Sequence, residues 1–128
     1  MLRYDIVPDG TIIFIEGSGH IDDQHVVDFM YELFRDTRVK PNALIYFDAS
    51  RINSGAISDE TILLKQRLFT QNPDRFGSLR LAIYAPLEHQ FDMAELYLMH
   101  ISGLPVHARL FGDQAVAQLW LGIPVQII

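Results

Sequence analysis

The sequence predicts an α/β sandwich: an N-terminal β-hairpin, then alternating helices and strands, around a mostly parallel five-stranded sheet with about four helices. Three observations support this prediction. The 128-residue chain is 49% hydrophobic, which suffices for a full core. Residues 43–47 form an uncharged run of strand formers, and segments with helix and strand periodicity alternate after the hairpin. No repeat, linker or low-complexity run interrupts the chain, so we expect one domain over residues 1–128.

Strands are expected where β-branched and aromatic residues cluster between turn signals. Residues 2–7 and 11–16 are two such runs, and the Pro-Asp-Gly sequence between them predicts a tight turn and therefore a hairpin. The Gly-Ser-Gly-His segment at 17–20 is expected to break the second strand. The run at 43–47 cannot expose one face to water, so we expect it at the centre of the sheet with helices on both sides. Two later strands are expected at residues 79–85 and 106–111.

Capping residues and apolar spacing predict the helices. Asp22, Ser58 and Asp113 are suitable N-caps, because their side-chain oxygens can accept hydrogen bonds from the free amides of a first turn. The third helix is unusual, since it is apolar over most of its circumference, more than packing on one side of a sheet requires. The helices are expected at residues 23–36, 58–72, 87–102 and 113–122, followed by an apolar tail at 124–128.

Composition argues against several classes of function. The formal charge is -6, from ten basic and sixteen acidic residues without a basic cluster, which argues against nucleic acid or an anionic membrane surface as the main partner. The absence of cysteine excludes disulfides, thiol nucleophiles and cysteine-type zinc sites. No apolar run has the length of a signal peptide or a membrane span, so we expect a cytoplasmic protein without stable membrane insertion.

Motif spacing favours neither metal binding nor catalysis. No two histidines have the i, i+4 spacing of a two-histidine metal site, and no HExxH pattern occurs. The chain has no GxSxG turn, and a cluster of Ser50, His20 and Asp48 is conceivable but not required by their spacing. We therefore expect no metal, no cofactor and no enzymatic activity.

Polar side chains gather where the central strand is expected to end. Asp48, Ser50 and Arg51 follow the buried run, and open α/β sheets place their ligands at the carboxyl ends of strands. Ser18 and His20, from the neighbouring strand end, would lie beside them. One interpretation is structural, with Asp48 capping loop amides and pairing with Arg51. The alternatives are a site for a small ligand or a protein partner and phosphorylation of Ser50.

The apolar third helix also has more than one interpretation. It can pack on the sheet and be covered by the C-terminal tail. Alternatively, Met93, Leu96, Tyr97 and His100 form a self-complementary patch that buries itself in a homodimer, which is the outcome we favour. The surplus of methionine and aromatic residues is also compatible with a pocket for a small apolar ligand between this helix and the sheet.

The order of the elements and four short phrases resemble the SpoIIAA-like superfamily. The phrases are GSGHIDD, IYFDASRI, LAIYAPLEHQFDMAELY and VHARLFGDQAVAQLWL. This superfamily includes the STAS domains of anti-sigma factor antagonists and is structurally related to the lipid-binding SEC14 (CRAL-TRIO) fold. The resemblance covers nearly the whole chain.

The resemblance implies a candidate regulatory residue but departs from the family pattern beside it. In the antagonists, the central strand ends in an acidic and serine motif followed by glycine, and phosphorylation of the serine switches partner binding. Asp48 and Ser50 fall at the matching positions, which implies Ser50 as the phosphoacceptor. Arg51, however, stands where the motif has glycine, and Ser50 is not at a helix N-terminus that would accommodate a phosphate. The strand ending resembles instead the STAS/SEC14-like branch of unknown function.

Together, the residues and the resemblance predict a non-enzymatic binding or regulatory module that acts through protein-protein contacts. The alternative is a carrier or sensor of a small apolar, lipid-like ligand, and a small enzyme comes third. Each function requires a different feature. A regulatory module needs an exposed Ser50 loop, a carrier needs an apolar cavity, and an enzyme needs a titratable pair with shifted pKa values in a cleft.

Overall fold

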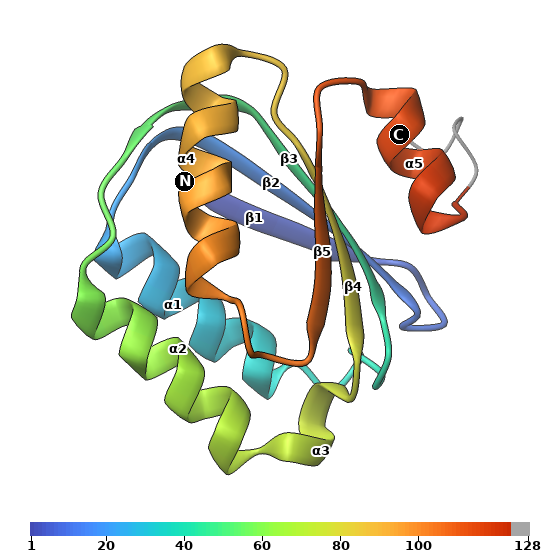
Figure 1. Cartoon of the computed structure of the whole chain (residues 1–128). Helices are drawn as coiled ribbons and strands as arrows, with labels where there is room; N and C mark the ends of the chain where they lie inside the picture. The colour runs from blue at the N-terminus through green and yellow to red at the C-terminus, as the bar shows by residue number, and fades with distance from the viewer. Residues whose placement is uncertain (124–128) are drawn as a thin grey trace.

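Five strands form one sheet in the order β1-β2-β3-β4-β5 in the computed structural model, which describes residues 1–123 (Figure 1). The strands are β1 (Leu2–Ile6), β2 (Ile12–Ile21), β3 (Leu44–Gly55), β4 (Leu79–Tyr84) and β5 (Val106–Phe111). The helices are α1 (Asp23–Arg35), α2 (Asp59–Gln71), α3 (Pro73–Phe76), α4 (Glu88–His100) and α5 (Gln114–Leu121). The apolar tail predicted at residues 124–128 lies outside the described residues.

The helices are distributed unequally over the two faces of the sheet. β1 and β2 pair antiparallel, as the predicted hairpin requires, and each later strand pairs parallel with the one before it. Because the parallel strands follow one another in one direction across the sheet, right-handed crossovers place their connecting helices on the same face. α1, α2 and α4 cover that face, whereas α5 covers the other (Figure 1). The predicted α/β fold is confirmed, with five helices in the described part instead of about four.

Alternate residues of the strands enter two separate cores. Ile13, Ile45 and Leu81 stand opposite one another on adjacent strands and belong to the core beneath α1, α2 and α4. Tyr46 and Ala82 belong to the core beneath α5. The prediction that the run at 43–47 is central and covered on both sides is confirmed.

Two strands extend further than the sequence predicts. The expected break at 17–20 and the expected loop after Asp48 are both wrong, because β2 continues to Ile21 and β3 to Gly55, paired with each other. Two register shifts interrupt this pairing, and Gly19 takes a positive φ of 70° at the second. β3 pairs with β4 only as far as Asp48, so the rest of β3 has a neighbouring strand on the β2 side alone.

The helix termini follow the predicted capping chemistry. Asp22, Ser58 and Asp113 each accept a hydrogen bond from the backbone amide three residues further along. The short helix α3 was not predicted. The Asn-Pro-Asp sequence that ends α2 also begins α3, because proline is well suited to the first turn of a helix.

Arg75 of α3 holds the C-terminal end of α1. Its guanidinium group donates hydrogen bonds to the carbonyl oxygens of Phe34 (3.0 Å), Asp36 (2.6 Å) and Val39 (3.1 Å). Carbonyl groups at and beyond a helix C-terminus lack partners within the helix, so a side chain that satisfies three of them stabilises the connection. α3 therefore links the end of α1 to the chain that enters β3.

Candidate ligand-binding site

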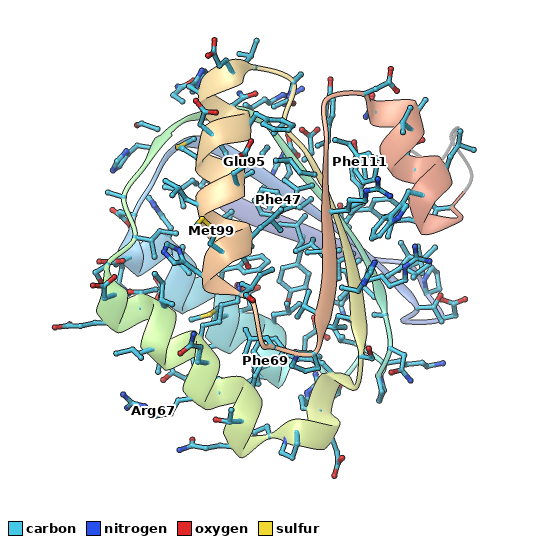
Figure 2. The ribbon with its side chains drawn as sticks, viewed as in Figure 1. Phe47, Arg67, Phe69, Glu95, Met99 and Phe111 are labelled. Carbon is cyan, nitrogen blue, oxygen red and sulfur yellow. The ribbon has the colours of Figure 1, made fainter. Side chains whose placement is uncertain are left out.

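A cavity of about 480 Å³ lies between the sheet and the three helices α1, α2 and α4. Its walls are mainly apolar side chains from these helices and from β2, β3, β4 and β5. Phe47 of β3 and Phe69 of α2 are two of them (Figure 2). Pockets for small ligands have volumes of roughly 300 to 1,000 Å³ and are lined mainly by apolar groups, so this cavity has the size and character of a binding site.

The placement of α2 explains why the space stays open. α2 approaches α1 and α3 closely, whereas α4 and α1 are the helices of this face that approach the strands. On α4 the closely packed positions are Gln90 and Ala94, and Ala94 is too small to fill the space in front of the sheet. Phe34, Phe69 and Phe76 pack against one another, with ring centroids 4.7 to 5.8 Å apart, and line the end of the cavity near α3.

The rim of the cavity lies between α4 and the segment that enters α2. Ile57, Leu96 and His100 line the cavity and are also exposed to solvent, with exposed fractions of 38% for Ile57 and 57% for Leu96. A lining residue that is also exposed marks the place where the cavity opens. The apolar interior is therefore accessible from this side without unfolding of the sheet.

Gln90 is a polar residue of the cavity wall whose role is structural. Its side chain is 2% exposed, donates to the carbonyl oxygens of Ser50 (2.8 Å) and Ile52 (3.1 Å), and accepts from the amide of Leu87 (3.1 Å). These two carbonyls lie in the part of β3 that extends past β4. Gln90 thus replaces the missing strand neighbour and ties the N-terminus of α4 to β3.

Lys65 and Tyr97 form a polar pair in this apolar wall. The Lys65 ammonium group donates a hydrogen bond to the Tyr97 hydroxyl and lies 4.3 Å from the centre of the Tyr97 ring. Within the described part of the chain, no Asp or Glu lines the cavity and Lys65 belongs to no ion pair. Burial lowers the pKa of Lys65 to about 8, because the charged form loses its hydration.

Lys65 is not among the site residues that the sequence predicts. Thr61, Lys65 and Phe69 are spaced four residues apart, so all three lie on the face of α2 that lines the cavity. The signal that could have identified Lys65 is its position one turn before Phe69, on the apolar stripe of an otherwise amphipathic helix. Arg67, two residues further on, is exposed and points away from the fold, as a solvated charge should (Figure 2).

The structure brings the predicted polar site together only in part. Asp48 accepts a hydrogen bond from the amide of Ser50 (2.9 Å), but Arg51 pairs with Glu16 (3.1 Å) and not with Asp48, so the proposed Asp48–Arg51 pairing is wrong. Ser18 of β2 stands opposite Arg51 of β3. These residues lie within β2 and β3, where the two strands pair with each other, and not at their ends.

His20 and Ser50 depart from the arrangement expected of them. His20 Nδ1 lies 2.7 Å from Ser54 Oγ, so its partner is a serine further along β3. Ser50 is half-buried inside β3 and not in an exposed loop, and its amide and carbonyl groups are both hydrogen-bonded. Strand alternation places Asp48 on the side of Tyr46, the face of the sheet that α5 covers, away from the cavity. The binding and phosphorylation roles of these residues stay predictions.

The four residues predicted to form a dimer interface all line the cavity. Met93 and Tyr97 are half-buried with their side chains in its wall, whereas Leu96 and His100 are exposed at its rim. The structure thus links the interface and pocket interpretations of this helix to the same side chains. The homodimer itself stays a prediction.

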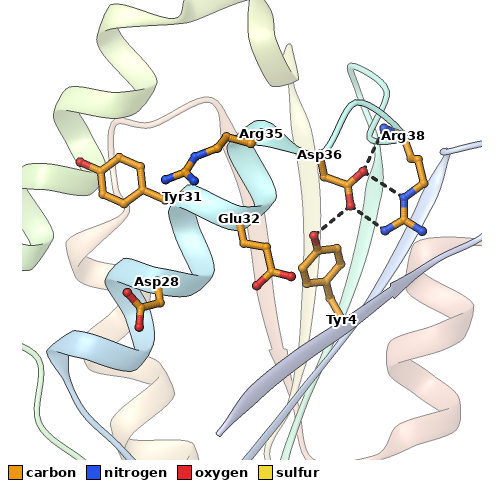
Figure 3. A pocket seen from close by; sticks show the side chains of 7 residues that line it. All are labelled: Tyr4, Asp28, Tyr31, Glu32, Arg35, Asp36 and Arg38. Atoms are coloured by element: carbon orange, nitrogen blue, oxygen red, sulfur yellow. Dashed lines mark hydrogen bonds and ion pairs between the residues drawn. The ribbon is translucent and has the colours of Figure 1, made fainter.

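A second hollow, on the outer surface beside α1, is lined by three acidic and two basic side chains, of which Asp36 and Arg38 form an ion pair (Figure 3). The Tyr4 hydroxyl donates to Asp36 (2.9 Å), and Arg38 donates to both carboxylate oxygens of Asp36 (2.6 and 3.0 Å). The Arg38 guanidinium holds the pKa of Asp36 well below its usual range, and burial together with Asp36 raises the pKa of Tyr4 to about 12. This cluster joins β1 to the end of α1 and is structural.

Two further properties of the described residues bear on function. None of their helices has the length and apolar character needed to cross a membrane. Residues 1–123 also contain no cluster of three or more His, Asp or Glu side chains that could hold a metal ion.

The topology and the layered arrangement define a SpoIIAA-like α/β fold, as the sequence resemblance predicts. A crystal structure of an uncharacterized DUF3478-family protein with a SpoIIAA-like fold, from Shewanella loihica PV-4, is similar to this chain with a TM-score of 0.55 and 14% identity. The match covers 94% of this chain and 92% of the other. No protein-family model and no curated protein matches the sequence. At this identity the similarity shows the fold, so function must be argued from the site.

Proposed function

We propose that this protein binds a small apolar ligand in the cavity beneath α1, α2 and α4, as a non-enzymatic carrier or sensor. The observation that supports this function is the cavity itself, because protein interiors are close-packed and voids much larger than a water molecule are rare. The apolar walls of the cavity meet the water that enters at its rim, and an apolar molecule that covers them contributes about 25 cal/mol per Å² of surface removed from water.

The proposed ligand has a chain of about ten carbon atoms or a comparable ring system. Burial of each methylene contributes about 0.8 kcal/mol, so ten contribute roughly 8 kcal/mol before the costs of association. Because those costs reduce the net affinity, we expect dissociation constants no tighter than about the micromolar range. The phosphorylation-switched regulatory module has less support, because Ser50 is half-buried in β3 instead of exposed in a loop.

The test is titration of the delipidated protein with the neutral fluorescent probe N-phenyl-1-naphthylamine. We expect saturable binding of one probe per chain, with a blue-shifted emission. Two variants, Ala94→Phe on α4 and Ile62→Trp on α2, add bulk at two positions of the cavity wall and should abolish the signal. Ala115→Phe adds the same bulk on the exposed side of α5 and should leave it unchanged. Non-saturable binding, or equal binding by the filled and control variants, would refute the proposal.

A further inference from the structure

Lys65 is the feature of the cavity that apolar-ligand binding does not explain. A lysine on a surface helix usually extends its ammonium group to water along the apolar surface. Lys65 instead turns inward between α2 and α4, where its nearest polar partner is the Tyr97 hydroxyl. The chain has only two lysines, of which Lys40 is exposed and Lys65 is half-buried.

The pair leaves hydrogen-bond donors unused at one end of the cavity. An ammonium group has three N–H donors, and among residues 1–123 Lys65 makes one hydrogen bond, to Tyr97. Because the Tyr97 oxygen accepts that bond, its own O–H is available to donate. Two kinds of donor therefore converge on one point at the boundary between the apolar interior and the rim.

The charges around this point call for an anion. The titratable groups that line the cavity from α2 and α4 are Lys65, Tyr97 and His100, and none of them is acidic at neutral pH. α1 and the strands present only apolar side chains to it. Gln66, which donates to the carbonyl oxygen of His100 (3.4 Å), adds no charge. A half-buried cation without a counter-ion loses part of its hydration, and a ligand that supplies a negative charge offsets that loss.

We propose that the ligand is an amphiphile with a single carboxylate, a fatty-acid-like molecule whose head group binds Lys65 and Tyr97 while its chain fills the cavity. This inference rests on the proposed function and specifies its ligand class. The two carboxylate oxygens accept from the ammonium group and from the Tyr97 hydroxyl, which are the charge-assisted bonds that contribute most. Tyr97 acts as a positioning residue for Lys65 and as a second donor.

The first experiment compares dodecanoate with dodecanol, two ligands with the same chain and different head groups, below their aggregation limits at pH 7. We expect the wild-type protein to bind dodecanoate about ten- to a hundredfold more tightly than dodecanol. Lys65→Met should remove this preference by weakening dodecanoate binding more than dodecanol binding, and Tyr97→Phe should reduce the preference less. Lys40→Met is the matched control and should behave as wild type.

A second measurement does not depend on the folding of any variant. In protein labelled with ¹³C-lysine, the two ε-carbon signals report the titration of Lys40 and Lys65 separately. Lys65 should titrate near its lowered pKa of about 8 in the free protein, and dodecanoate should raise that pKa while Lys40 does not respond.

The outcomes separate the two proposals. Equal affinity for dodecanoate and dodecanol, or a Lys65 titration that dodecanoate leaves unchanged, overturns the head-group inference while apolar-ligand binding stands. Binding of neither ligand, together with no probe binding, overturns the proposed function itself. If dodecyl phosphate binds more tightly than dodecanoate, the proposed carboxylate head group is wrong and the ligand is a phosphate-bearing lipid.

Discussion

The two faces of the sheet differ in how they are covered. On one face the single helix α5 packs closely, and the small residues Ala82 of β4 and Ala117 of α5 are both 0% exposed. On the other face three helices enclose a cavity of about 480 Å³. A small residue on the strand and another on the helix allow α5 to approach the sheet. In contrast, α2 is held by its neighbouring helices and stands away from the strands. More helices therefore do not make a denser core.

The strongest test of this difference inserts the same bulk on both faces. Ala117→Leu should cost about 2 to 3 kcal/mol of unfolding free energy, because the close contact between α5 and the sheet has no room for three more carbon atoms. Ala94→Leu, whose side chain would enter the cavity, should change it by less than about 0.5 kcal/mol or stabilise the fold. Urea unfolding measures both. Equal costs would mean that the cavity face is as tightly packed as the α5 face.

The second prediction concerns how the helices of the open face are held. Arg75→Met should destabilise the fold by about 2 kcal/mol, because three carbonyl groups around the end of α1 lose a charged donor. Arg67→Met, an exposed position on α2, should have almost no effect. If thermal and urea unfolding give the two variants the same stability, the hydrogen bonds of Arg75 to these carbonyl groups do not stabilise the helices of this face.

A smaller effect is expected from the pH dependence of the free energy of unfolding. The pKa of Lys65 is lowered to about 8 in the fold, while an unfolded lysine titrates near 10.5. Between these values the unfolded chain binds more protons, so stability should rise with pH, by roughly 1 to 2 kcal/mol from pH 7.5 to 9.5. Lys65→Met should lack this rise, whereas Lys40→Met should keep it. If the unfolding free energy of the wild-type protein does not change over this pH range, the Lys65 ammonium group is hydrated in the fold.

The smallest effect on stability is expected from substitutions at exposed positions of α4 and α5. These substitutions test the predicted homodimer. Leu96 of α4, one of the four residues predicted to form the interface, is 57% exposed. We propose that the patch around Leu96 contacts a second copy, so Leu96→Glu should give a soluble monomer in multi-angle light scattering. Leu119→Glu on α5, where Leu119 is 68% exposed, is the matched control. A mass unchanged by Leu96→Glu removes α4 as the interface.

Local chemistry was sufficient to predict most of the elements. The hairpin turn, the N-caps Asp22, Ser58 and Asp113, and the buried run at 43–47 each depend on residues close together in sequence, and each is present. The extension of β3 to Gly55 could not be predicted in this way. Its polar residues resemble a loop, and they become strand only because β2 pairs with them from more than thirty positions away.

The sequence by itself determined the fold class and the order of the elements. Only the tertiary structure decided that Arg51 pairs with Glu16, that Ser50 is half-buried, and that Lys65 meets Tyr97. Lys65 and Tyr97 are 32 residues apart on separate helices, and either one alone is an ordinary helix residue. The cavity between those helices depends on how far α2 stands from the sheet, a distance set by packing and not by any local sequence pattern.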